Sequence, residues 1–125
     1  MGGQKMNGNI YYLEPAEIIN IVAKKLNVLP EQVVSTERKR EYIKAKHIAM
    51  YFCRQFTDYS TEKIGEFFNG KDHSTIIHAT KSVKNQRDIY TSYRKQLELI
   101  LDELKIQAGD EVDSQKYKNY DTDNV

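Results

Sequence analysis

Residues 60–86 of this 125-residue chain, STEKIGEFFNGKDHSTIIHATKSVKNQ, contain two helical patterns separated by a turn signal, and this segment constrains the fold most. Ser60 is a suitable N-cap for the first helix. The apolar stripe of that helix consists of Ile64, Phe67 and Phe68. Asn69-Gly70 follows, and these residue types readily adopt the left-handed conformation that ends a helix. Because Asp72 is a suitable N-cap for the second helix, the segment predicts a helix-turn-helix.

Polar side chains occupy the start of the second helix, where a recognition helix meets DNA. They are Lys71, Asp72, His73, Ser74 and Thr75. An α-helix fits the major groove, and its first turn reaches the base edges there. A carboxylate accepts from the cytosine amino group, whereas hydroxyls and an imidazole can bond other base edges. Taken singly, such residues are more often caps or solvated side chains, so the pattern needs further support.

Charge is distributed unevenly along the chain, although the formal net charge is only +1. Residues 35–87 contain 11 Lys/Arg and 6 Asp/Glu, a net charge of +5. Residues 102–125 contain 3 Lys/Arg and 7 Asp/Glu, a net charge of −4. A basic centre with an acidic end fits a surface that faces phosphates, but it also fits an ordinary hydrated surface.

Length and composition limit the class of protein. A chain of 125 residues has room for one domain with its own core. It contains no apolar run of about 20 residues and no hydrophobic segment near its start, so we expect a cytoplasmic protein that does not enter a membrane. Cys53 is the single cysteine and lies among apolar residues, which excludes an internal disulfide and predicts a buried thiol.

The remaining periodicity is helical, and no convincing alternating strand pattern occurs. We expect further helices at about 14–27, 30–34, 41–56 and 88–107. The predicted core-facing residues are Ile18, Ile19, Val22, Leu26, Val33, Val34, Ile43, Ile48, Met50, Tyr51, Phe52, Phe56, Ile89, Tyr93, Leu97, Ile100, Leu101 and Leu104. The fold class is therefore all-α, a compact helical bundle. We expect it at residues 13–107, between a flexible leader (1–12) and an acidic, disordered tail (108–125) with little apolar area.

Three patterns resemble a phosphate-binding loop, a catalytic triad and a zinc site, but their residue types or spacing do not fit these sites. The stretch from Gly65 to Lys71 has the spacing of a phosphate-binding loop, but Asp72 stands where a hydroxyl should meet Mg²⁺. Asp72, His73 and Ser74 are triad residue types, but neighbouring helical side chains diverge by about 100°. His73 and His78 are poorly spaced for zinc, and we expect His78 to be packed within the bundle. We expect no enzymatic activity, no cofactor and no metal site.

The run from Glu62 to Ala79, EKIGEFFNGKDHSTIIHA, resembles the signature of the C-terminal DNA-binding domain of the bacterial replication initiator DnaA. The GKDHSTIIHA core is long and specific, and the resemblance extends over most of residues 14–104. It implies a helical bundle of the Trp-repressor type. In that family the helix-turn-helix reads a short DNA box in the major groove, while an arginine of the preceding basic loop enters the adjacent minor groove.

Matched position by position, the resemblance implies roles for individual residues. Base reading in the major groove falls to Lys71, Asp72, His73, Ser74 and Thr75. Arg38 matches the position of the family's arginine that enters the minor groove. A guanidinium suits a narrow, electronegative minor groove. Contacts to the DNA backbone are expected from Lys39, Arg40, Lys46, Arg54, Lys63 and Lys81.

The chain departs from the family pattern at three places. Lys71 replaces the usual arginine, Thr36-Glu37 stands where the loop is often basic, and Lys44-Ala45-Lys46 lacks the common proline. We expect these departures to affect affinity and the preferred box.

Two functions fit these observations. The first is sequence-specific binding of double-stranded, DnaA-box-like DNA at replication origins, in the initiation or regulation of replication, without an ATPase module. The second is a module that keeps the fold but does not read DNA, and instead binds another replication protein through its charged surface or acidic tail. Met1 and the long tail after Leu104 favour a natural stand-alone bacterial protein, which we expect to act as a monomer at the nucleoid.

Overall fold

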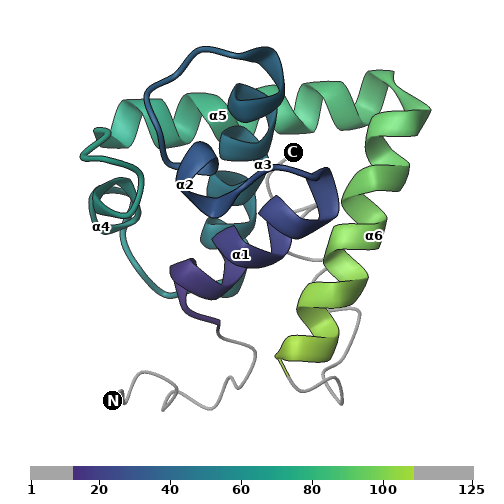
Figure 1. Ribbon diagram of the computed structural model, residues 1–125, viewed down its shortest axis with the longest axis horizontal. Coiled ribbons are helices and arrows are strands. Elements are labelled where there is room, and N and C mark those ends of the chain that lie inside the picture. Colours follow the sequence, from purple (N-terminus) through teal and green to yellow (C-terminus); the bar gives the residue numbers. More distant parts are fainter. Residues whose placement is uncertain (1–12, 109–125) are drawn as a thin grey trace.

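The computed structural model describes residues 13–108, and within this range it contains helices and no strand (Figure 1). In chain order the helices are α1 (Pro15–Leu26), α2 (Pro30–Val33), α3 (Arg40–Phe56), α4 (Thr61–Glu66), α5 (His73–Ile89) and α6 (Thr91–Gln107). The prediction of an all-α domain is confirmed. The predicted leader, and the predicted tail from residue 109 onward, lie outside the described residues.

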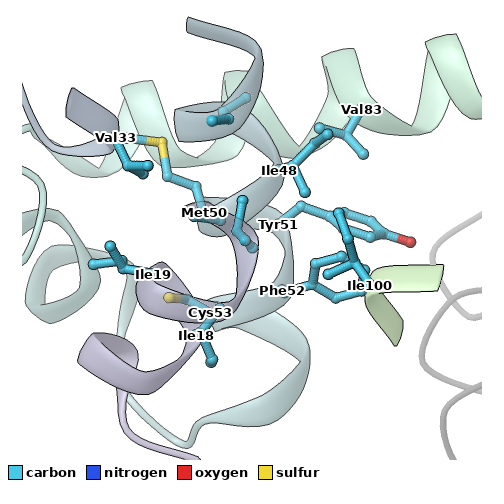
Figure 2. Close-up of a cluster of buried hydrophobic side chains, with 14 of the residues drawn as sticks. Ile18, Ile19, Val33, Ile48, Met50, Tyr51, Phe52, Cys53, Val83 and Ile100 are labelled. Atoms are coloured by element: carbon cyan, nitrogen blue, oxygen red, sulfur yellow. The ribbon is translucent and has the colours of Figure 1, made fainter. Parts of the chain in front are cut away.

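Helix α3 forms the centre of the bundle. It packs against α1, α2, α4 and α5, while α6 packs against α1 and α5. Figure 1 shows α5 along one edge of the molecule and α6 turning away from its end. Figure 2 shows the core around α3, where Ile48 and Phe52 lie among side chains of α1, α2, α5 and α6. Since α3 touches most other helices, its apolar surface organises the fold.

Local sequence signals explain where helices α1 and α2 begin and where α1 ends. Pro15 occupies the first position of α1, where a missing N–H costs nothing, and the carboxylate of Glu17 accepts from the Glu14 N–H at 2.9 Å. Asn27 ends the helix in the left-handed conformation, with φ of 61°. Pro30 likewise begins α2. The predicted positions of these two helices are confirmed.

The helix-turn-helix consists of α4, its following turn and α5. Ser60 Oγ accepts from the Lys63 N–H at 3.1 Å, and both Asn69 and Gly70 have positive φ values, 66° and 75°. Gly65 lies directly under the turn, because a Cβ placed on it would be 1.9 Å from the carbonyl oxygen of Lys71. The absence of a side chain at Gly65 therefore lets the turn close onto α4.

The boundary between α5 and α6 differs from the sequence prediction. We expected one helix from about Asp88, but α5 continues to Ile89, and only Tyr90 separates it from α6, in an extended conformation with ψ of 116°. Ile89 was predicted to face the core and is 67% exposed. No glycine or proline marks this corner, so local sequence carries no signal for it. Its position follows from the packing of α6 against α1.

Cys53 is fully buried in α3, as predicted, and burial raises the pKa of its thiol. Between residues 13 and 108, no helix is long and apolar enough to cross a membrane. The same residues contain no group of three or more His, Cys, Asp or Glu side chains arranged to hold a metal ion.

Candidate nucleic-acid interface

The tip of α5 is held by its own N-cap. Oδ1 of Asp72 accepts from both the backbone N–H and the hydroxyl of Thr75, each at 3.0 Å. The backbone N–H bond, followed by the hydroxyl bond, holds the pKa of Asp72 below its ordinary value, so the carboxylate stays charged. The structure thus gives Asp72 and Thr75 a structural role in addition to the predicted one.

One face of α5 is buried and the other is exposed. Ile76, Ala79, Thr80 and Val83 form the buried side. The exposed side of the first three turns consists of His73, Ser74, Ile77, His78 and Lys81. His78 was predicted to be packed within the bundle, and this prediction is wrong. A residue every 100° places His78 next to Ser74 and Lys81, on the outer surface.

His73 has a neighbour on α4. Its Nδ1 lies 3.8 Å from Oε2 of Glu62, and the side chains of both residues are more than half exposed. The contact places Glu62 of α4 beside the first residue of α5.

The loop before α3 carries Arg38 and Lys39, and local bonds shape it. The Ser35 hydroxyl donates to the Gln32 carbonyl at 3.0 Å and accepts from the Glu37 N–H at 3.2 Å. The ammonium of Lys46 donates to the Ser35 carbonyl. These bonds fix the base of the loop to α2 and α3, whereas Arg38 and Lys39 are exposed.

A hollow of about 500 Å³ joins this loop to α5. It is lined by Arg38, Arg40, Ile43, Lys44, His47, Ser82, Gln86 and Tyr93. Arg38, Arg40 and Lys44 make its lining basic, and its walls come from α3, α5 and α6. In Figure 1 the loop and α5 lie at the same edge of the molecule. The structure therefore places Arg38, the sequence-predicted minor-groove residue, beside the C-terminal half of α5.

The predicted backbone contacts fall into two groups. Lys39, Arg40, Arg54, Lys63 and Lys81 are exposed, whereas Lys71, which was predicted to read bases, is half-buried. Lys63 forms an ion pair with Glu66 at 3.2 Å within α4. Lys46 is different, because only 7% of the residue is exposed and its ammonium holds the loop. Burial, and then the nearby charges of Lys71 and Arg38, lower its pKa. A direct phosphate contact does not fit this position, and we assign Lys46 a structural role.

Sequence reasoning missed four residues of this surface: Glu62, His47, Ile77 and His78. Ile77 and His78 could have been identified from the sequence, because helical spacing from Ser74 predicts their exposure. Glu62 and His47 depend on contacts between helices. His47 lies in the hollow, and burial, followed by the charges of Lys46 and His78, lowers its pKa.

Comparison with known proteins identifies relatives of the chain. Residues 15–83 match the family described as the bacterial dnaA protein helix-turn-helix. The chromosomal replication initiator protein DnaA of Bacteroides fragilis is 42% identical over 89 residues, which cover 71% of this chain and 19% of that protein. The corresponding protein of Streptococcus thermophilus is 36% identical over 103 residues, which cover 82% of this chain and 23% of that protein. The chain therefore spans about one fifth of the length of these relatives.

Proposed function

Because this chain belongs to the bacterial DnaA helix-turn-helix family, we propose that it binds double-stranded DNA sequence-specifically, with α5 in the major groove and Arg38 in the adjacent minor groove. The preferred site is a DnaA-box-like sequence, and the role is in the initiation or regulation of replication. The family match covers the helix-turn-helix region, and no ATPase domain is among the matches. Reading DNA requires no catalytic step, so the proposal assigns the chain none.

One observation carries the proposal: the tip of α5 is polar and exposed, and the exposed Arg38 lines a basic hollow together with Ser82 and Gln86 of the same helix. A strand of DNA separates the two grooves, and its phosphates are anionic. A surface that enters both grooves must present cations between them. Arg40, which lines the hollow together with Arg38, is such a cation.

Selection from a duplex pool with a randomised centre tests the proposal. We expect enrichment of a short motif and, for the purified chain, binding of this motif that is at least a hundredfold tighter than binding of a scrambled duplex. Affinity for both duplexes should fall steeply with salt, because each neutralised phosphate releases condensed counterions. A pool that returns no motif would overturn the proposal and favour the protein-interaction alternative.

Two variants sharpen the test. His73→Ala removes a side chain at the tip of α5, and we expect a loss of about 1–3 kcal/mol on the motif with little loss on scrambled DNA. Lys95→Ala serves as the control, since it removes an exposed cation on α6. Equal weakening of both duplexes by His73→Ala would count against base reading by this residue.

A further inference from the structure

The basic hollow contains cations that have no anionic partner within the described domain. None of the described residues that line it is acidic. The ammonium of Lys44 donates to Oε1 of Gln96 at 2.5 Å and lies 5.3 Å from the centre of the Tyr93 ring. The guanidinium groups of Arg38 and Arg40 have neither a hydrogen bond nor an ion pair within that domain. These two arginines are therefore available to an anion.

The chain itself supplies anions after α6. Residues 109–125 contain five Asp/Glu and two Lys, a net charge of −3. The acidic residues form two groups, the first composed of Asp110, Glu111 and Asp113 and the second of Asp121 and Asp123. Side chains two residues apart in an extended segment point to the same side, about 7 Å apart, so the second group can present its two carboxylates together. A carboxylate and a guanidinium form a charge-assisted pair with two parallel hydrogen bonds.

Chain length decides which acidic group reaches the hollow. Tyr93 lines the hollow, and α6 runs from there to its C-cap at Ala108, a distance of about 22 Å at 1.5 Å per residue. Figure 1 shows α6 leading away from the end of α5. An extended chain spans at most about 3.6 Å per residue, so Glu111 lies no more than about 11 Å from Ala108, whereas Asp121 can lie about 45 Å from it. The second acidic group can therefore return to the hollow, and the first cannot.

We propose that Asp121 and Asp123 bind Arg38 and Arg40 in the DNA-free protein, so that DNA must displace this acidic segment from the hollow. The contact depends only on the hollow and the segment, whereas the competition rests on the proposed function, which places Arg38 in the minor groove. A tethered segment has an effective concentration in the millimolar range, so weak ion pairs suffice to populate the contact. The contact lowers the apparent affinity for DNA in proportion to the fraction of molecules in which the hollow is covered.

Variants that remove charge without changing size test the competition. Asp121→Asn/Asp123→Asn should bind the selected duplex about three- to tenfold more tightly than the wild type. Asp110→Asn/Glu111→Gln is the matched control, because it changes the net charge equally at residues too close to α6 to reach the hollow. At 0.15 M salt the long-range effect of charge is screened, so the control should gain less than about twofold. Fluorescence anisotropy measures both gains. Equal gains would mean that net charge alone matters, and the inference would be wrong while the proposed function stands.

A nitroxide at position 122 tests the contact without DNA. Cys53 is fully buried, so the Thr122→Cys variant takes the label at position 122. We expect paramagnetic broadening of the backbone amide signals of Arg38 and Arg40, and its loss when Asp121→Asn/Asp123→Asn is added to the labelled variant. The selected duplex should also abolish the broadening.

The outcomes of this measurement separate the two proposals. Sharp amide signals for Arg38 and Arg40 in the DNA-free protein would overturn the inference, whatever the selection from the duplex pool returns. Broadening that persists with the duplex bound would overturn the competition. If no sequence is selected, the proposed function fails, and the nitroxide still decides whether the acidic segment occupies the hollow.

Discussion

At the residue scale, Arg38 and Lys39 are adjacent exposed cations of the basic loop for which we expect different roles. Arg38→Ala should weaken binding to the selected motif by about 1–3 kcal/mol and relax discrimination at the base pairs beside the helix-turn-helix site. Lys39→Ala should weaken binding to matched and scrambled DNA alike. It should also reduce the slope of the logarithm of the binding constant against the logarithm of the salt concentration by about 1. Fluorescence anisotropy with both duplexes at several salt concentrations measures both effects.

Arg38→Lys provides the matched control for charge. It keeps the positive charge but loses the planar guanidinium. Compared with Arg38→Ala, it should therefore recover affinity for scrambled DNA, but less of the preference for the selected motif over scrambled DNA. If Arg38→Ala and Lys39→Ala changed both duplexes by the same factor, the assignment of Arg38 to the minor groove would be wrong.

His47 gives the protein a pH-dependent stability. Its pKa in the folded protein is lowered by burial and then by the charges of Lys46 and His78, so the folded state takes up a proton less readily than the unfolded chain, with a pKa of about 6.5. Above this pH both states are neutral at His47. As the pH falls through 6.5 the unfolded state gains the proton first, so the free energy of unfolding falls until the folded-state pKa is passed.

Urea unfolding of the wild type and His47→Gln at pH 7.5 and 5.5 tests this expectation. We expect a smaller loss of stability between the two pH values for His47→Gln. His73→Gln is the control, because its side chain is 53% exposed at the tip of α5. An unchanged pH dependence in His47→Gln would contradict the prediction.

At the scale of elements, the close approach of α4 to its own turn depends on Gly65. Gly65→Ala places a Cβ 1.9 Å from the Lys71 carbonyl oxygen, and because the clash is with backbone, α5 must shift relative to α4. We expect a destabilisation of about 2–4 kcal/mol and a loss of specific DNA binding. Chemical denaturation and anisotropy with the selected duplex measure the two effects.

Gly70→Ala is the matched control in the same turn. Nothing lies within 4 Å of a Cβ at Gly70, but its φ of 75° is unfavourable for alanine. The expected cost is therefore about 1 kcal/mol, without a clash, and Gly70→Asn should cost less because asparagine tolerates this conformation. A Gly65→Ala variant as stable as Gly70→Ala would show that the turn can relax away from α4.

At the scale of the whole molecule, Cys53 reports on the integrity of the core. It is fully buried on α3 and burial raises the pKa of its thiol, so a reagent that attacks the thiolate has neither access nor a reactive group in the folded state. We expect thiol labelling of native protein only as fast as the chain opens. The labelling rate should rise with urea in parallel with unfolding followed by circular dichroism. Rapid labelling in the absence of urea would show that α3 is accessible without unfolding.

The sequence by itself determined the helix-turn-helix and the class of the fold. Ser60 and Asp72 as caps, Asn69-Gly70 between them, and the apolar stripe of α4 are signals within a few residues of one another. Local backbone preferences decide such features, so they can be read before the tertiary structure is known. The same holds for the exposed face of α5, where helical spacing alone would have corrected the expectation for His78.

Only the tertiary structure decided the corner at Tyr90, the exposure of Ile89, the burial of Lys46, and the meeting of the basic loop with α5 around the hollow. The corner and the hollow depend on helices far apart in the sequence, α6 against α1 and α3 against α5, while the burial of Lys46 depends on the loop that folds back onto α3. Local sequence carries no record of such contacts, because whether a side chain is buried depends on which distant surface packs over it. The residues of the proposed DNA-binding surface could be named from the sequence, but their arrangement follows from the packing of the whole bundle.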